Sequence, residues 1–259
     1  MFGHTINAAV NMSELATPPP LDIQAHALFI DLDGTLFDIV ERPEEVVADA
    51  EARALLKGLA RAMDGALAVV SGRKVCDVER IFKGAGRFCI AGLHGQEFRL
   101  RDGARRSLPV TANVRSAAIR ALALEKDAIL PMRVEDKGNA VALHFRHAPE
   151  HASLIRRAAD EIALKNGLRA LHGKMVAELV PHGLTKGVAI EVLMHEPAFA
   201  GRTPIALGDD VTDEDAFDAA REWGGKGIYV GRPVATLADF SLADVAAVRA
   251  WLRSALDAA

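Results

Sequence analysis

The segment ALFIDLDGTLF, residues 27–37, places two carboxylates directly after a short run of apolar residues. The run over residues 27–30 has the length and composition of a buried β-strand, and Gly34 allows the backbone to turn away after it. In an open α/β sheet, ligands bind at the carboxyl ends of the parallel strands. The segment therefore predicts that Asp31 and Asp33 project into a ligand-binding crevice at the edge of such a sheet.

A calcium-binding loop is the alternative for this segment, because D-x-D-G also opens the EF-hand pattern. That loop needs a further liganding position before the glycine and a glutamate where this chain has Val40. Here Gly34 follows Asp33 at once. The pattern therefore favours a strand-edge site over a calcium loop.

The composition is that of an ordinary globular protein: of 259 residues, 50% are apolar and 25% are charged. This length suits one large α/β domain, or a core with a smaller second domain. The formal net charge of −4 gives no general attraction to nucleic acid or an anionic membrane, and no apolar run approaches membrane-spanning length. We therefore expect no nucleic-acid partner and no membrane partner.

The N-terminal region and the cysteines favour a cytoplasmic location. The first basic residue is Arg42, so the N-terminus lacks the cationic start of a secretory signal and the arginines of a transit peptide. Cys76 and Cys89 make no disulfide framework or metal pattern and fit a reducing compartment. Residues 1–25, which include the prolines at 18–20, are expected to form a loose leader.

Strand and helix patterns alternate through the first part of the chain and again near its end. The expected order is helix 43–63, strand 66–70, helix 74–84, strand 88–92 and a hairpin around 102–103, then helix 185–196, strand 203–207, helix 213–223, strand 227–230 and helix 245–256. This alternation is typical of a doubly wound, Rossmann-like parallel sheet.

A different pattern interrupts the alternation. The order there is helix 112–128, strands 132–136 and 139–147, helix 149–166, and strands 168–172 and 175–181. Helix, two strands, helix, two strands is an α+β unit rather than a continuation of the doubly wound pattern. We therefore predict an α/β core over residues 26–108 and 181–259, with an inserted α+β domain over residues 109–180.

Four core segments each carry a polar group after an apolar stretch or at a helix start. These groups are Asp31 with Asp33, Ser71, Lys186, and Asp209 with Asp210 and Asp213. Three of the segments follow predicted strands, so their ends lie on one edge of a parallel sheet. A phosphate ester bound there would meet a nucleophile, an acid, a hydroxyl donor and a cation.

Carboxylates gathered in one crevice repel each other and a phosphate dianion, which calls for a divalent cation. Magnesium fits, because it binds a few oxygen ligands, keeps waters and binds phosphate oxygens. Lys186, at a predicted helix start, would complete the charge balance. Taken singly, Ser71 could be a helix N-cap, Lys186 a solvated lysine, and the acids of GDDVTDEDAF the usual acids of a helix start.

Together and in this order, FIDLDGTL, VVSGR, the Lys186 segment and LGDDVTDEDAF resemble the motifs of the haloacid dehalogenase-like phosphatases. The resemblance implies that Asp31 is the nucleophile that forms an aspartyl phosphate and that Asp33 is the general acid and base. It also implies phosphate binding by Ser71, Gly72 and Lys186, and a magnesium ion held by Asp31, the Asp33 carbonyl and Asp209, with Asp210 and Asp213 in support.

The chain resembles the trehalose-6-phosphate phosphatase family more closely, through SGR at 71–73, GLHGQE at 92–97, VEDKG at 134–138 and HGKMVAELVPHGLTKG at 172–187. This resemblance implies that the insert is a cap and that the substrate is a small molecule, trehalose 6-phosphate. The implied reaction is its hydrolysis to trehalose and phosphate, the last step of trehalose biosynthesis. The implied substrate-binding residues are Arg73, His94, Glu135, Lys137 and Glu178. The chain departs from the common family pattern at Gln96 and His182.

The residues of the insert are themselves suited to a polyol. Two acids and one base on an alternating sheet, Glu135, Glu178 and Lys137, could form the several hydrogen bonds that sugar hydroxyls need. From the charge pattern alone, a solvated cap surface explains the same residues.

Rival functions remain at this point. One is a capped phosphatase for another sugar phosphate, such as sucrose phosphate, and another is a sugar-phosphate sensor without catalysis, which the presence of both Asp31 and Asp33 disfavours. A nucleotide-binding module is weaker, because neither a P-loop nor G-x-G-x-x-G occurs at a strand-to-helix turn. The resemblance also raises the hypothesis that this chain associates with a trehalose-6-phosphate synthase.

Overall fold

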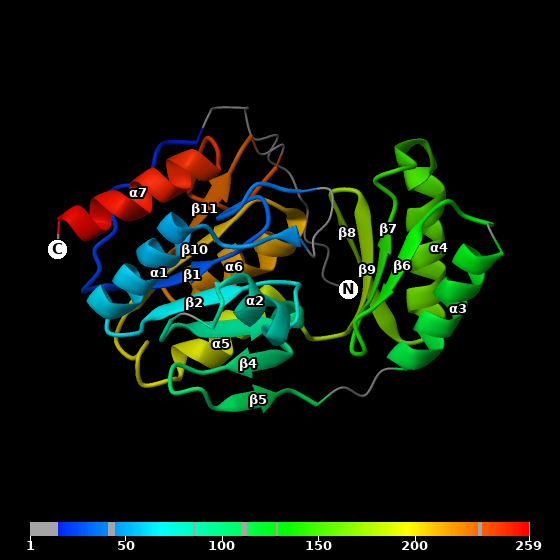
Figure 1. Ribbon diagram of the computed structural model, residues 1–259, viewed down its shortest axis with the longest axis horizontal. Coiled ribbons are helices and arrows are strands. Elements are labelled where there is room, and N and C mark those ends of the chain that lie inside the picture. The colour runs from blue at the N-terminus through cyan, green and yellow to red at the C-terminus, as the bar shows by residue number, and fades with distance from the viewer. Residues whose placement is uncertain are drawn as a thin grey trace, which may run out of the picture.

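The computed structural model describes residues 15–40, 45–84, 86–109, 113–127, 129–232 and 235–258. Its larger part contains an eight-stranded sheet in the order β12-β11-β10-β1-β2-β3-β4-β5 (Figure 1). The strands are β1 His26–Ile30, β2 Leu67–Val70, β3 Cys89–Gly92, β4 Glu97–Arg99, β5 Arg105–Ser107, β10 Thr203–Gly208, β11 Lys226–Val230 and β12 Phe240–Leu242. All pairings are parallel except those of β4 with β3 and with β5.

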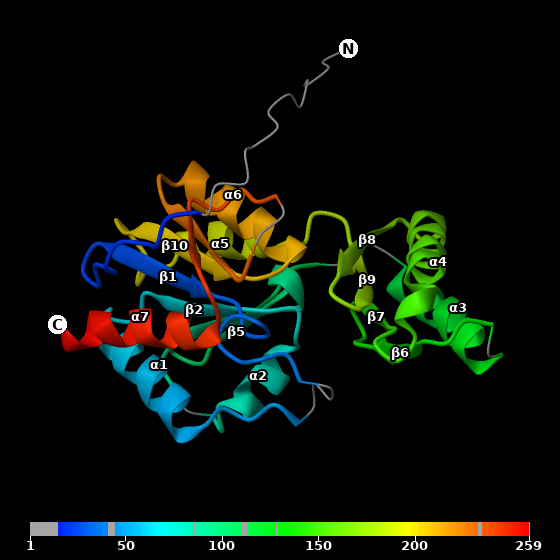
Figure 2. The same ribbon diagram turned by 90° about the horizontal axis from the view of Figure 1, so that it is seen from above.

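Helices cover both faces of this sheet, as a doubly wound fold requires. They are α1 Ala50–Ala62, α2 Val75–Ile81, α5 Lys186–Met194, α6 Glu214–Glu222 and α7 Val245–Asp257. Seen from above, α1, α2 and α7 lie on one side of the sheet and α5 and α6 on the other (Figure 2). The predicted fold class, a doubly wound α/β sheet, is therefore confirmed.

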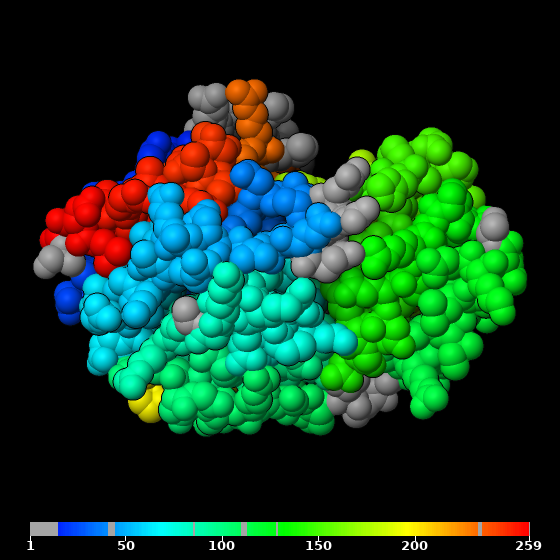
Figure 3. Space-filling model, viewed as in Figure 1, coloured from blue at the N-terminus to red at the C-terminus, as the bar shows by residue number. Residues whose placement is uncertain are grey.

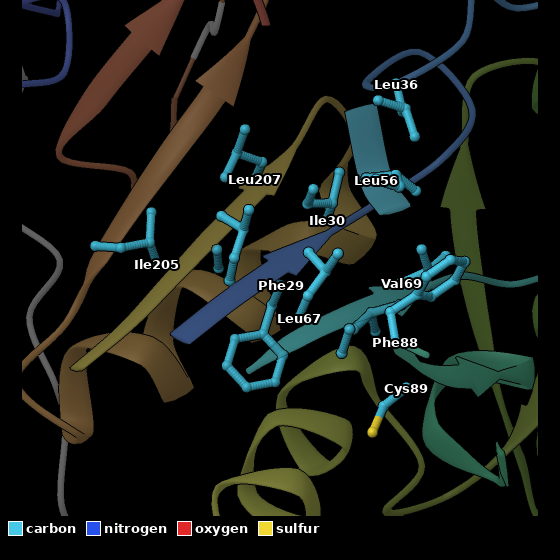
Figure 4. Packing of buried hydrophobic residues seen from close by; sticks show 14 of the residues in the cluster. Phe29, Ile30, Leu36, Leu56, Leu67, Val69, Phe88, Cys89, Ile205 and Leu207 are labelled. Atoms are coloured by element: carbon cyan, nitrogen blue, oxygen red, sulfur yellow. The ribbon is translucent and has the colours of Figure 1, made fainter. Parts of the chain in front are cut away.

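The central strands are apolar on both faces because helices cover both. Every residue of β2 and β3 is buried, and so are the last four of β1. Phe29 stacks on Phe199 with ring centroids 5.3 Å apart, and Ile30 and Leu207 lie in the same apolar cluster (Figure 4). Full burial of each such side chain contributes roughly 1.5 to 3 kcal/mol, which holds the strand ends in a fixed place.

The smaller part is an antiparallel sheet in the order β6-β7-β9-β8, with two helices packed on one face. Its elements are α3 Val114–Lys126, β6 Arg133–Asp136, β7 Val141–His144, α4 Ala152–Lys165, β8 Leu168–Gly173 and β9 Val176–Pro181. It has an apolar cluster of its own, and the helices lie on the side away from the larger part (Figure 1). The sheet, called the cap sheet below, therefore faces the core.

Several predicted elements differ from the structure at their ends. The helix expected over 43–63 begins at Ala50, because the Asp49 side chain accepts a hydrogen bond from Ala52 N at 2.7 Å and caps it. Residues 43 and 44 of that prediction lie outside the described residues. The sequence analysis did not predict β12, a three-residue edge strand beside β11. The hairpin around 102–103 is present between β4 and β5.

The described part of the leader is fixed to the core rather than loose. Trp251 Nε1 donates to the carbonyl of Pro19 at 2.9 Å, and Ser241 N donates to the carbonyl of Ala16 at 3.0 Å. Leu21 and Ile23 are buried. The expectation of a loose segment is therefore wrong for residues 15–25, and residues 1–14 lie outside the described residues.

Within the described ranges, no helix has the length and apolar character needed to cross a membrane.

Candidate active site

Three predicted site residues directly follow adjacent parallel strands. Asp31 follows β1, Ser71 follows β2 and Asp209 follows β10, and all three are buried. The register pairs Ile30 with both Val69 and Leu207, so these strands end at the same level. Strand pairing therefore brings the three side chains to one edge of the sheet.

A cavity of about 900 Å³ lies between this edge and the cap sheet. Figure 3 shows the cap, in green, lying against the core. Predicted site residues line the cavity from both sides: Asp31, Asp33, Ser71, Gly72, Arg73, His94, Lys186, Asp209 and Asp210 from the core, and Glu135, Lys137 and Glu178 from the cap.

Lys186 lies between two carboxylates at the start of α5. Its Nζ donates to Asp31 Oδ1 at 2.7 Å and to Asp213 Oδ1 at 2.6 Å, and all three side chains are buried. Burial raises the pKa of Asp31 to about 7 although Lys186 opposes the shift. Asp213 and Asp31 together raise the pKa of the Lys186 ammonium above its ordinary value, outweighing its burial. This lysine is therefore a fixed positive charge at the floor of the cavity.

Asp213 and Asp210 shape the loop after β10. Asp213 Oδ2 accepts from the backbone N–H groups of Asp209 and Asp210, at 3.2 and 3.1 Å. Asp210 in turn caps the short helix η4, Val211–Asp213, by accepting from Val211 N at 2.7 Å. These contacts fix the backbone that carries Asp209.

Gly34 leaves space for Asp209. Its φ is +91°, and a Cβ at this position would lie 2.2 Å from Asp209 Oδ2. A side chain there would therefore displace a carboxylate as well as strain the backbone. This explains why the D-x-D segment ends in glycine.

The acid cluster fits a magnesium ion. Oxygen atoms of Asp31, Asp209 and Asp213 lie within 4.8 Å of one another, and hard oxygen donors of this kind suit Mg²⁺. Burial, followed by the charge of Asp31, raises the pKa of Asp209 to about 6, and a divalent cation would offset both effects. Besides the predicted carboxylates of Asp31 and Asp209, the cluster contains that of Asp213.

The Asp33 carboxylate pairs with Arg73. Arg73 Nε donates to Asp33 Oδ2 and Nη2 donates to Oδ1, each at 2.6 Å. This two-point pairing fixes the plane of the carboxylate at the cavity wall. Arg73, predicted to bind substrate, thus contacts the predicted acid in this structure.

Ser71 and Gly72 form the turn between β2 and α2. Ser71 is not a helix cap, because Lys74 occupies that position; its Oγ instead accepts from Arg73 N at 3.1 Å. A Cβ at Gly72 would lie 2.8 Å from His94 Nε2. The glycine therefore allows His94 to pack against the turn.

His94, Lys137 and Glu178 form a network that joins the core to the cap. Lys137 Nζ donates to Glu178 Oε1 at 2.5 Å and to the carbonyl of Gly72 at 3.1 Å, and His94 Nε2 is hydrogen-bonded to Glu178 Oε2. Burial alone would raise the pKa of Glu178, but Lys137 and His94 lower it well below its usual range. Three predicted substrate-binding residues are therefore in contact with one another.

His94 occupies an unusual backbone conformation. Its φ is +55° and that of Leu93 is +48°, a region that L-residues rarely adopt. Such conformations cost about 1 to 3 kcal/mol each and persist where the surroundings fix them, often at functional sites. Here they direct the buried imidazole toward the cap.

Glu135 lies in the same cavity but outside this network of hydrogen bonds. It is hydrogen-bonded to His144 Nε2 at 3.0 Å, and its side chain is 45% exposed. The bond to His144 lowers the pKa of Glu135 more than burial raises it.

The sequence analysis missed Lys174, which reaches the acid cluster from the cap. Its Nζ donates to Asp209 Oδ2 at 2.6 Å. It lies within the quoted segment HGKMVAELVPHGLTKG, where Gly-Lys between two strands marks a turn with a charged tip. The Gly-Lys turn could have suggested that Lys174 makes a contact at the edge of the cap, but it could not have identified Asp209 as the partner.

Comparison with known proteins decides the family. The trehalose-phosphatase family model matches residues 29–244, which include every residue of the candidate site described above. The chain belongs to the trehalose-phosphatase family. Members of this family are phosphoric monoester hydrolases, so the predicted enzyme class is confirmed.

Relatives of this trehalose-phosphatase family chain span nearly its whole length. It is 37% identical to the trehalose-6-phosphate phosphatase of Escherichia coli strain K12, over 93% of this chain and 90% of that protein. It is 39% identical to a probable trehalose-phosphate phosphatase of Sinorhizobium fredii, over 82% and 80% of the two chains. A crystal structure of a trehalose-6-phosphate phosphatase related protein covers 89% of this chain and 97% of its own, with a TM-score of 0.68 and 29% identity.

Proposed function

We propose that this phosphatase hydrolyses trehalose 6-phosphate to trehalose and phosphate, through an aspartyl phosphate on Asp31, as the last step of trehalose biosynthesis. One observation carries the proposal. The buried Asp31–Lys186 pair, from the core, and the polar network of Lys137 and Glu178, from the cap, line one cavity. A ligand with a phosphate at one end and several hydroxyls at the other suits that arrangement.

Asp31 performs the first chemical step. A carboxylate oxygen of Asp31 attacks phosphorus, the bond from phosphorus to the sugar oxygen breaks, and Asp33 donates its proton to that oxygen. Water then attacks phosphorus, Asp33 takes the proton of the water, and Asp31 is released as a carboxylate. For this, Arg73 must leave Asp33, which it contacts through two hydrogen bonds in the structure.

The phosphoryl group is held by the groups around Asp31. Lys186 provides a buried positive charge beside Asp31, at 2.7 Å from its Oδ1. Ser71 and the backbone of Gly72 line the same wall and provide hydrogen-bond donors. These groups stabilise the charge that is spread over the equatorial phosphoryl oxygens in the transition state.

Asp31, Asp209 and the carbonyl of Asp33 are the groups we propose to hold magnesium, with Asp210 and Asp213 in support. When bound, the ion neutralises the carboxylates and polarises the phosphoryl oxygens. Asp213 is already paired with Lys186, so it serves to place that lysine.

The network of the cap is suited to exchange partners with sugar hydroxyls. His94 is buried and Lys137 and Glu178 are half-buried, and each bond among these donors and acceptors can be replaced by a bond to a hydroxyl. A ligand without hydroxyls cannot restore the bonds that it disrupts, so the site rejects it. Glu135 and Arg73 complete the predicted set at the same cavity. The synthase partner and the cytoplasmic location stay predictions.

Phosphate release from trehalose 6-phosphate, with and without magnesium, tests the proposed function. We expect turnover with Mg²⁺, loss of turnover in excess chelator and recovery on adding Mg²⁺ back, because the carboxylates of Asp31 and Asp209 repel a phosphate dianion. Sucrose 6-phosphate and a small aryl phosphate are the comparison substrates. Faster turnover of sucrose 6-phosphate would refute the substrate assignment, and full activity in chelator would refute the metal.

Glu178→Gln tests the sugar contact apart from the chemistry. We expect kcat/KM for trehalose 6-phosphate to fall, with a loss of transition-state stabilisation of about 1 to 3 kcal/mol, the worth of a hydrogen bond to a charged group. The value for an aryl phosphate should change little. The matched control is Glu161→Gln on α4 of the cap, where Glu161 forms an exposed pair with Lys165 at 3.8 Å. An equal fall on both substrates would show that Glu178 supports the core site rather than sugar recognition.

A further inference from the structure

The turn between β8 and β9 carries a lysine from the cap into the core. Lys174 Nζ donates to Asp209 Oδ2 at 2.6 Å and to the carbonyl of Asp209 at 3.1 Å. Lys174 N approaches Asp210 Oδ2 at 3.4 Å. In Figure 1, β8 and β9 lie on the side of the cap that faces the core. The turn therefore contacts the loop that follows β10.

The backbone of this turn is shaped for close approach. Met175 has a φ of +60°, and a Cβ at Gly173 would lie 2.7 Å from Asp210 Oδ2. The glycine therefore allows the turn to reach the core loop. The contact depends on a specific local conformation and not only on a long, flexible side chain.

Lys174 balances the charge of Asp209. Lys186 donates its hydrogen bonds to Asp31 and Asp213, whereas Lys174 donates one to the Asp209 carboxylate. The Asp209 side chain is 4% exposed, whereas that of Lys174 is 52% exposed. The carboxylate is thus fixed in the core, while the lysine can move into solvent at small cost.

We propose that Lys174 is a positioning residue that holds the cap on the core through Asp209 while the acid cluster is free of metal, and that a divalent cation displaces it. The inference rests on the magnesium site of the proposed function. A magnesium ion binds a carboxylate oxygen at about 2.1 Å, and an ammonium on the same carboxylate would then lie within a few ångströms of a second positive charge. The two cations therefore compete for Asp209.

The competition between Lys174 and the metal sets an order in which metal binding precedes substrate binding and closure of the cap. Metal binding releases the turn between β8 and β9, which loosens one of the contacts that close the cavity. The sugar phosphate can then reach the metal-loaded core, and its hydroxyls draw the cap back through Lys137 and Glu178. Lys174 thus links the charge of the acid cluster to the position of the cap.

Magnesium affinity, measured calorimetrically without substrate, tests the competition. If the lysine is paired with Asp209 about nine-tenths of the time, Lys174→Met should bind Mg²⁺ about tenfold more tightly than the wild type, because fewer molecules must first release Asp209. Lys174→Arg keeps the charge and should stay near the wild type. Lys165→Met, which removes an exposed cap lysine on α4, is the matched control and should not change the affinity.

Amide hydrogen exchange of residues 173–178 provides a second measurement. We expect Mg²⁺ to speed exchange in the wild type, whereas Lys174→Met should exchange faster without metal and respond little to it. An unchanged or weaker Mg²⁺ affinity in Lys174→Met, or no response of the wild-type turn to Mg²⁺, would overturn the proposal.

These outcomes are separate from the test of function. Turnover of trehalose 6-phosphate by the wild type, together with equal Mg²⁺ affinities, would overturn the role of Lys174 alone. Tighter binding in Lys174→Met without turnover of that ester would overturn the substrate alone.

Discussion

Asp31→Asn is expected to reduce turnover of trehalose 6-phosphate on the order of 10⁶-fold, the usual cost of removing the nucleophile of a covalent mechanism. The amide has the shape of the carboxylate and can still accept a hydrogen bond from Lys186, whose Nζ lies 2.7 Å from Asp31 Oδ1. It cannot attack phosphorus to form the acyl phosphate. Phosphate release and the melting temperature, measured on the same preparation, separate loss of chemistry from loss of fold.

The matched control is Asp218→Asn on the exposed face of α6, which should turn over at the wild-type rate. Phosphate release by Asp31→Asn at a hundredth of the wild-type rate or more would remove Asp31 from the nucleophile's role. A large loss of melting temperature would instead show that the carboxylate is needed for folding.

In metal-free buffer, the free energy of unfolding of Asp31→Asn should depend on pH differently from that of the wild type. Burial raises the pKa of Asp31 to about 7 in the native state, above the ordinary aspartate value that applies when the chain is unfolded. The native state then holds the proton more tightly, so this group lowers the free energy of unfolding as pH rises from about 4 to about 7. Asp31→Asn should lack that decline, which urea unfolding at pH 5 and pH 8 would measure.

The sequence was sufficient to predict the core of the site because the site follows directly from strand pairing. Asp31, Ser71 and Asp209 each come just after an apolar run, and parallel strands bring such positions to one edge. Lys186 could be placed with them because it lies at the start of the predicted helix 185–196, where the alternation of strands and helices resumes after the insert. The family resemblance then supplied the roles of these residues.

Some parts of the structure could not be predicted. They depend on the position of the cap on the core, on which of several acids a base pairs with, or on a strand too short to show a pattern. The bond of Lys174 to Asp209 and that of Lys137 to Gly72 join different sheets, and no periodicity encodes such a contact. Arg73 had several acids within reach, and its pairing with Asp33 depends on side-chain geometry. The three-residue strand β12 is too short to give a clear alternation.

Lys186→Met is expected to destabilise the protein by about 3 to 5 kcal/mol, because it leaves two buried carboxylates without their shared partner. In the wild type, Lys186 Nζ lies 2.7 Å from Asp31 Oδ1 and 2.6 Å from Asp213 Oδ1. In the variant no ammonium separates these two carboxylates. For a domain of this size the melting temperature should fall by roughly 6 to 20 °C. The control is Lys226→Met, which breaks an exposed pair with Asp239 and should cost about 1 kcal/mol or less.

The loss in Lys186→Met should depend on pH, which distinguishes charge from packing. Burial already raises the pKa of Asp213, and removing the ammonium raises the pKa of both carboxyls further. Because the native state of the variant then binds protons more tightly than the unfolded chain, its stability falls as pH rises through these native pKa values. Urea unfolding of both proteins in metal-free buffer should therefore show a larger deficit at pH 8 than at pH 5. A deficit that is equal at the two pH values would mean that Lys186 acts through its packed methylene chain, and the fixed positive charge assigned to the cavity floor would be wrong.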